Sequence, residues 1–144
     1  MHKSFAHITG QEHIKRQLSF YLDAYKNTSI LPFLIFNGQR GIGKTEFARA
    51  VGAACKKTFY EINSSSVKNE KQFFEQMMPQ IQDTECVLFW DECHELPRKL
   101  IAAFLSILNT EKKNVVTYTY QDVEYVFDFT KMSFIFATTE MDRL

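Results

Sequence analysis

The sequence predicts an α/β fold of three layers, in which helices cover both faces of a mostly parallel sheet. Short continuous apolar runs at residues 33–36 and 86–90 are typical of strands that are buried on both faces. Between such runs, apolar side chains recur at helical spacing, as they do in residues 11–27. Strands that alternate with helices join through right-handed crossovers into a parallel sheet.

The other elements follow from the same patterns. We expect further helices around residues 47–54, 73–81 and 100–108, and further strands at residues 58–62 and 132–137. Two runs of alternating side chains lie between Val115 and Phe129 and flank Gln121-Asp122, which predicts a β-hairpin before the last strand. There is no repeat or linker, so residues 1–144 are expected to form one domain.

Composition excludes several classes of protein. Lysine plus arginine equal aspartate plus glutamate at 17 each, so the chain lacks the basic footprint of a stand-alone nucleic-acid binder. Contact with DNA would have to be local or come through a partner. No apolar run is long enough to span a membrane, and no secretory signal begins the chain. Three cysteines without paired spacing favour reduced thiols in the cytoplasm.

A loop rich in glycine lies between the first expected strand and the next helix. Its residues Gly38, Gln39, Arg40, Gly41, Ile42, Gly43, Lys44 and Thr45 fit the pattern G-x-x-x-x-G-K-[ST]. Glycines let backbone N–H groups surround a phosphate, and the following helix directs its positive N-terminus at the anion. Lys44 can bridge phosphates and the Thr45 hydroxyl can bind Mg²⁺. Arg40 adds a positive charge, whereas Glu46 places a carboxylate near the phosphates.

A pair of carboxylates ends the apolar run at residues 86–90. Because parallel strands bind ligands at their carboxyl ends, Asp91 is placed to hold Mg²⁺ through water and Glu92 to deprotonate an attacking water. The alternative is that Asp91-Glu92 only ends the strand; the phosphate loop upstream favours the functional interpretation. A base beside the Mg²⁺ ligand favours hydrolysis over phosphate transfer between nucleotides.

Two threonines, Thr138 and Thr139, follow the last expected strand. A hydroxyl at this position could reach the attacking water or the terminal phosphate from the neighbouring strand. A simple strand-ending turn explains the same two residues equally well.

In this order the segments resemble those of the AAA+ ATPases, and among them the RuvB-type motors of Holliday-junction branch migration. Ile8-Thr9-Gly10-Gln11-Glu12 looks like the I-G-Q-E box of the nucleotide-binding domain of these motors. Residues 38–45 resemble their Walker A loop, Asp91-Glu92-Cys93-His94 their D-E-x-H Walker B segment, and Phe136-Ala137-Thr138-Thr139 their sensor-1 segment. The loop differs from the usual G-P-P-G by having Gln39 and Arg40 in place of the prolines.

The resemblance implies a P-loop fold that binds ATP and Mg²⁺ and hydrolyses ATP between the subunits of a ring. By this likeness Ile8 lies near the adenine and residues 38–46 contact the phosphates. Lys44, Glu92 and Thr139 would be catalytic, with Glu92 as base and Thr139 as sensor, and Thr45 and Asp91 would hold Mg²⁺. The arginine finger, the helical lid and the DNA-binding winged helix of the family would lie beyond Leu144.

The expected hairpin distinguishes between relatives. RuvB-type motors carry a hairpin there and use it to grip a junction-binding partner on branched DNA, which would make the segment from Val115 to Phe129 a partner site. An edge hairpin without a partner is the plainer alternative. Clamp-loader-like ATPases, the second candidate, have only a short link at this point. A third candidate is a nucleotide-gated binding module that does not hydrolyse ATP.

Overall fold

The computed structural model describes residues 3–109 and 114–144. Four strands form a parallel sheet in the order β1-β6-β3-β2, which confirms the predicted α/β class. Their bounds are β1 Leu34–Asn37, β2 Thr58–Asn63, β3 Cys86–Asp91 and β6 Met132–Thr138. The antiparallel hairpin before the last strand is confirmed as β4 Val115–Tyr120 and β5 Val123–Asp128.

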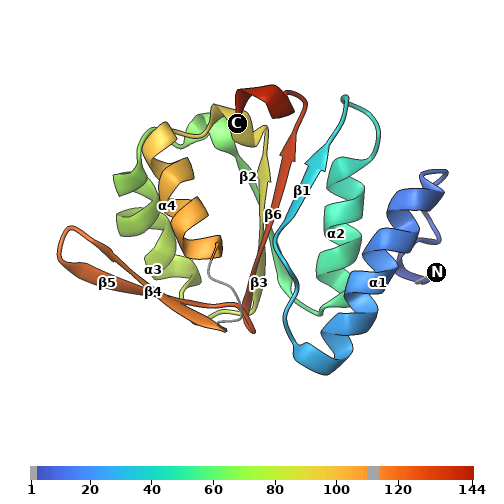
Figure 1. Cartoon of the computed structure of the whole chain (residues 1–144), viewed down its shortest axis with the longest axis horizontal. Coiled ribbons are helices and arrows are strands. Elements are labelled where there is room, and N and C mark those ends of the chain that lie inside the picture. Colours follow the sequence, from blue (N-terminus) through green and yellow to red (C-terminus); the bar gives the residue numbers. More distant parts are fainter. Residues whose placement is uncertain (1–2, 110–113) are drawn as a thin grey trace.

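Helices cover both faces of the sheet, as Figure 1 shows. The helices α1 Glu12–Thr28 and α2 Lys44–Ala54 lie on one face. The other face carries α3 Met78–Ile81, which continues the helical turn Gln72–Met77, and α4 Arg98–Leu108. The hairpin lies on the side of α3 and α4, near the end of the sheet where β6 begins. Among the described residues no helix is both long and apolar enough to cross a membrane.

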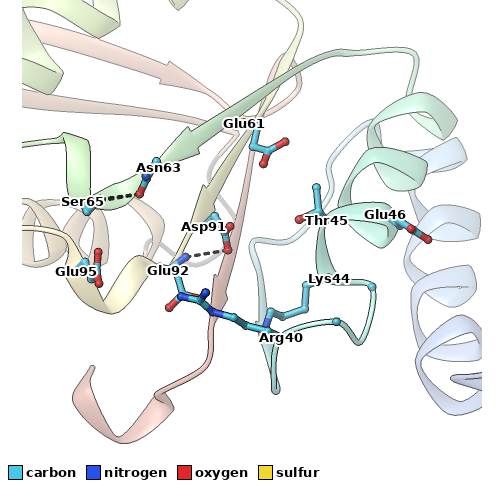
Figure 2. A pocket seen from close by; sticks show the side chains of 12 residues that line it. Arg40, Lys44, Thr45, Glu46, Glu61, Asn63, Ser65, Asp91, Glu92 and Glu95 are labelled. Carbon is cyan, nitrogen blue, oxygen red and sulfur yellow. Dashed lines mark hydrogen bonds between the residues drawn. The ribbon is translucent and has the colours of Figure 1, made fainter.

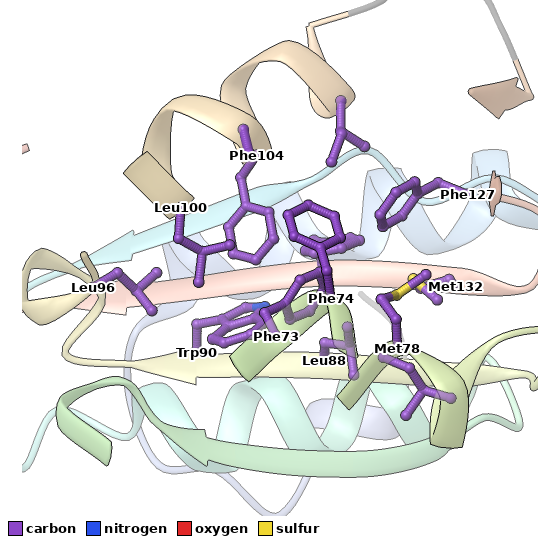
Figure 3. Close-up of a cluster of buried hydrophobic side chains, with 14 of the residues drawn as sticks. Phe73, Phe74, Met78, Leu88, Trp90, Leu96, Leu100, Phe104, Phe127 and Met132 are labelled. Atoms are coloured by element: carbon purple, nitrogen blue, oxygen red, sulfur yellow. The ribbon is translucent and has the colours of Figure 1, made fainter. Parts of the chain in front are cut away.

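The two faces have separate cores because successive side chains of a strand point to opposite sides. On β3, Val87 and Phe89 pack under α1 and α2, while Leu88 and Trp90 pack under α3 and α4. Figure 3 shows the second core, in which Phe73, Phe104 and Trp90 meet with ring centroids 5.0 to 5.7 Å apart. The Phe73–Phe104 pair is edge-to-face, a contact that stabilises a core beyond simple burial of area. The positions of the carboxyl ends of β3 and β6 are therefore fixed from both sides.

The expectation that residues 33–36 form a strand buried on both faces is wrong. Strand β1 is at the edge of the sheet, and Ile35 is 40% exposed and Phe33 42% exposed. No described strand pairs with the outer side of β1, which leaves these side chains uncovered. A continuous apolar run predicts the strand correctly, but it does not distinguish a central strand from an edge.

The helix expected at residues 73–81 is only partly α-helical. Residues Gln72–Met77 form a π-helical turn, in which the N–H of Met78 donates to the carbonyl of Phe73. Pro79 has no N–H to donate to the preceding turn, so the wider turn satisfies the backbone before the proline. The widening allows the consecutive residues Phe73 and Phe74 both to be fully buried.

The hairpin turn has two residues in the left-handed backbone conformation, and neither of them is glycine. Both Gln121, with φ 48°, and Asp122, with φ 65°, are in the left-handed region. Two consecutive left-handed residues match the twist of the flanking strands. The inner side of the hairpin packs on Phe74, whose ring stacks with Tyr118 at 5.3 Å and with Tyr120 at 4.7 Å.

Candidate functional site

A cavity of about 630 Å³ opens at the carboxyl ends of the strands. Its lining combines the glycine-rich loop with the ends of β2 and β3, and Figure 2 shows Lys44 and Thr45 across from Asp91 and Glu92. The lining residues are Arg40, Gly41, Gly43, Lys44, Thr45, Glu46, Glu61, Asn63, Ser65, Asp91, Glu92 and Glu95. The sheet thus brings the two predicted motifs together although they are far apart in the sequence.

The loop is shaped by two glycines with positive φ. Gly41 has φ 84° and Gly43 has φ 91°, which are backbone conformations that L side chains rarely adopt. Gly43 caps the N-terminus of α2, so Lys44 and Thr45 form its first turn. The Nζ of Lys44 donates to the carbonyls of Gly38 and Gln39, the latter at 3.2 Å. The loop therefore curls around its own lysine and leaves backbone N–H groups at the helix start for an anion.

Strand β3 positions the carboxylates of Asp91 and Glu92 at its carboxyl end. Trp90 is completely buried and Asp91, the last residue of the strand, is half-buried at the cavity. Glu92 leaves the strand in a left-handed conformation, with φ 52°, and its N–H donates to Oδ1 of Asp91 at 3.0 Å. This turn separates the two carboxylates, so Asp91 remains beside the loop while Glu92 reaches toward β6.

The hydroxyl of Thr139 meets Glu92. Its Oγ1 donates to Oε2 of Glu92 at 3.1 Å. The preceding residue, Thr138, is completely buried, and its carbonyl accepts from the N–H of Gly38 at 3.2 Å. The last strand therefore contacts both the start of the phosphate loop and the carboxylate expected to act as base.

The other predicted site residues take different positions. Gly38 and Gln39 contribute carbonyls to Lys44, as above, and Ile42 lines an adjoining cavity of about 410 Å³ between α1 and β1. Ile8 is 6% exposed and packs in the core under α1 and α2. Its carbonyl accepts from the buried Nζ of Lys15. Ile8 is not part of the lining of the phosphate-loop cavity.

Sequence reasoning missed the contribution of β2. Asn63 pairs in register with Asp91, so the end of β2 lies beside the carboxylates, and Glu61, Asn63 and Ser65 line the cavity. Ser65 donates to Oδ1 of Asn63 through both its backbone N–H, at 3.1 Å, and its hydroxyl, at 2.8 Å. The signal was present: polar residues directly after a strand of a parallel sheet lie at the edge where ligands bind.

The charge of the cavity fits a polyphosphate with a divalent cation. Five carboxylates but only two cationic side chains line it, and one carboxylate, Glu61, also pairs with Arg49 at 2.7 Å. Within the described residues, no group of three or more metal-binding side chains is present. Mg²⁺ is typically held by one or two protein oxygens together with phosphate oxygens and water, which Thr45 and Asp91 can supply. The residues therefore fit Mg²⁺ that arrives with a nucleotide.

Comparison with known proteins identifies the family. The sequence model of the ATPase family associated with various cellular activities (AAA) matches residues 34–144. The chain belongs to this family. Membership in an ATPase family implies nucleotide binding, typically with Mg²⁺.

Individual relatives are more distant. Two curated relatives are Protein STICHEL of Arabidopsis thaliana, 26% identical over 97% of this chain, and the Holliday junction branch migration complex subunit RuvB of Rhodopirellula baltica, 29% identical over 66%. The matched regions cover only 12% and 26% of those two proteins.

Solved structures support the same fold. The P216G mutant of Thermotoga maritima RuvB superposes with a TM-score of 0.74 at 23% identity, covering 99% of this chain and 44% of that one. The Thermotoga maritima RuvB Holliday junction branch migration motor gives a TM-score of 0.70 at 22% identity, covering 94% of this chain and 40% of that one. The AAA fold is thus shared with RuvB over nearly the whole chain.

Proposed function

We propose that this chain is the ATP-binding and ATP-hydrolysing core of a RuvB-type AAA+ motor. The observation that carries the proposal is the meeting of Lys44, Asp91 and Glu92 at one cavity, with the Thr139 hydroxyl 3.1 Å from Glu92. A triphosphate-binding loop alone would serve many reactions. A carboxylate that is positioned by a hydroxyl beside that loop favours attack by water.

Each residue has a defined task in this proposal. The N–H groups of residues 41–45 and the ammonium of Lys44 bind the phosphates and offset their charge as the bond to the γ-phosphate breaks. Mg²⁺, held by Thr45 and Asp91, would supply further charge neutralisation. Glu92 accepts the proton of the attacking water, while Thr139 fixes the Oε2 side of its carboxylate. Ile8 is proposed to support the wall near the base.

The proposal extends to the larger assembly. Subunits would form a ring in the cytoplasm, with each nucleotide site completed by a neighbour, and hydrolysis would drive movement on branched DNA. The hairpin supports the RuvB-type assignment over a clamp loader, because its outer face is exposed and partly apolar: Val115 is 49% exposed and Val126 39% exposed. A junction-binding partner would bind this face.

The test measures ATP binding and phosphate release over a range of protein concentrations. Lys44→Ala is expected to abolish binding because the main cation facing the phosphates is lost. Glu92→Gln is expected to retain ATP binding but to reduce turnover by roughly 10²- to 10⁴-fold, since a general base contributes about that much. Lys26→Ala and Glu124→Gln are matched controls, because both residues are exposed and far from the cavity.

The outcomes separate the candidates. Turnover per subunit that rises with protein concentration supports an active site completed by a neighbour. ATP binding that requires Lys44, without turnover at any concentration, supports the non-hydrolysing nucleotide-gated module instead. Stimulation of turnover by a synthetic four-way DNA junction, lost in Val126→Glu without loss of basal turnover, would support the branch-migration role.

A further inference from the structure

His94 is a buried polar side chain that the proposed mechanism does not use. It lies in the short helical turn Cys93–Glu95 after β3, and its side chain is only 3% exposed. Its Nδ1 is 2.7 Å from Oγ1 of Thr138. On its other side, Nε2 is 3.3 Å from Oε2 of Glu92 and 3.2 Å from Oε2 of Glu140. One imidazole therefore joins the last strand to the carboxylate expected to act as base.

The neighbours of the two ring nitrogens favour one tautomer of the neutral imidazole. Oγ1 of Thr138 accepts from the N–H of Glu140 at 2.9 Å. Its own hydrogen is then free to be donated to Nδ1 of His94, since a hydroxyl donates one bond and accepts others. The arrangement favours a ring hydrogen on Nε2, because that nitrogen faces two carboxylates that can only accept when they are ionised. An Nδ1–H tautomer would instead place a bare Nε2 against both carboxylates.

We infer that His94 is the positioning residue that fixes the carboxylate of Glu92. Oε2 of Glu92 accepts from the hydroxyl of Thr139 at 3.1 Å and is 3.3 Å from Nε2 of His94, so groups from two different elements contact one oxygen. Among the described residues none hydrogen-bonds to Oε1 of Glu92, so this oxygen would be the one that accepts from water. Thr138 also accepts from Gly38, so the same imidazole keeps Glu92 in register with the phosphate loop.

Glu140 can weaken the contact between His94 and Glu92, because its carboxylate lies against the same ring nitrogen. It shares Nε2 of His94 with Glu92, but its Oε2 also accepts from Arg143 at 2.5 Å. The hydrogen bond and the charge of Arg143 hold the pKa of Glu140 below its ordinary value, so Glu140 stays ionised. The segment after β6 therefore places a second carboxylate, that of Glu140, against the same nitrogen that faces Glu92. The inference rests on the proposed function of Glu92 as base.

Two variants separate positioning from packing. The amide nitrogen of a glutamine at position 94 can occupy the place of Nε2, whereas an asparagine can replace only Nδ1 and keep the contact with Thr138. We expect His94→Asn to lower kcat roughly 10- to 100-fold, because slight misplacement of a catalytic group has effects of this size. KM and the thermal midpoint should change little, and His94→Gln should recover most of kcat. Equal losses in both variants, or a loss confined to KM, would contradict the inference.

An NMR measurement made without ATP tests the contact between His94 and Glu92 directly. In protein labelled with ¹⁵N-histidine, long-range proton–nitrogen correlation spectra distinguish the two tautomers, and His94→Gln assigns the signal. We expect the Nε2–H tautomer and a shift of the Nε2 resonance in both Glu92→Gln and Glu140→Gln. An Nδ1–H tautomer, or an Nε2 signal that Glu92→Gln does not move, would overturn the inference even if ATP is hydrolysed. The expected spectra without any turnover would instead uphold the contact and refute hydrolysis.

Discussion

The two ends of β3 and β6 use polar residues in opposite ways. At the carboxyl ends, Asp91 and Glu92 are half-buried and face a cavity. At the amino end of β6, Lys57 is only 8% exposed, and its Nζ donates to Oγ of the buried Ser133 at 2.9 Å. Burial lowers the pKa of Lys57, while nearby groups including Cys55 oppose that shift. Polar groups whose partners all lie inside the protein stabilise it, whereas those facing a cavity retain capacity for a ligand.

The largest expected effect is at the carboxyl end. Asp91→Asn should weaken Mg²⁺-dependent ATP binding by roughly 100-fold, because it removes a charged oxygen expected to hold the ion. The thermal midpoint should barely change, since no buried contact is lost. Titration of a fluorescent ATP analogue with and without Mg²⁺, beside a thermal melt, checks both. A large fall in the midpoint with unchanged binding would assign Asp91 to folding.

At the amino end of β6, replacing a polar residue should affect stability and leave ATP binding unchanged. Lys57→Met removes the donor to Ser133 and is expected to lower the free energy of unfolding by about 1–3 kcal/mol, the usual effect of leaving a buried polar group unpaired. Urea denaturation measures this loss, and ATP affinity should not change. The double variant Lys57→Met/Ser133→Ala is the matched control, because it leaves no orphaned hydroxyl. If it is as unstable as the single variant, the hydrogen bond is not the cause.

The smallest effect is a dependence on pH. Between the lowered pKa of Lys57 and the ordinary value of 10.5, the unfolded chain binds more protons at this residue than the folded chain does. Lys57 therefore makes stability rise with pH in that window, by at most about 1.4 kcal/mol per pH unit. The free energy of unfolding of the wild type minus that of Lys57→Met should increase with pH inside this window. Below the window this difference should not change with pH. A difference that falls with pH would contradict the lowered pKa.

The glycine-rich loop and the carboxylate pair Asp91-Glu92 were predictable because each is a feature of neighbouring residues. A triphosphate loop needs glycine, lysine and threonine at fixed spacing, so the sequence predicts such a loop without knowledge of the fold. Asp91 was predictable for a related reason, since a polar residue after a buried strand marks the ligand-binding edge of a parallel sheet. Neither prediction needed knowledge of which strands are neighbours.

The place of Asn63 after a strand was a usable signal, but its pairing with Asp91 and the contacts of His94 were not predictable in the same way. Asn63 reaches the cavity because β2 pairs with β3 in a register that places it opposite Asp91. His94 follows the carboxylate pair directly, yet its partners Thr138 and Glu140 are more than 40 residues away in sequence. No spacing rule specifies a contact between residues of different strands.

The sequence by itself determined the α/β class, the hairpin, the phosphate loop and the carboxylates, because periodicity and motif spacing are properties of neighbouring residues. The tertiary structure alone decided that β1 is the edge and that Pro79 follows a π-helical turn. It also decided that Thr139 and His94 contact Glu92, while Glu140 contacts the same His94. These features depend on strand order and on the packing of Phe73 and Trp90. Strand order and packing are set by the energy of the whole assembled core, in which residues distant in sequence become neighbours.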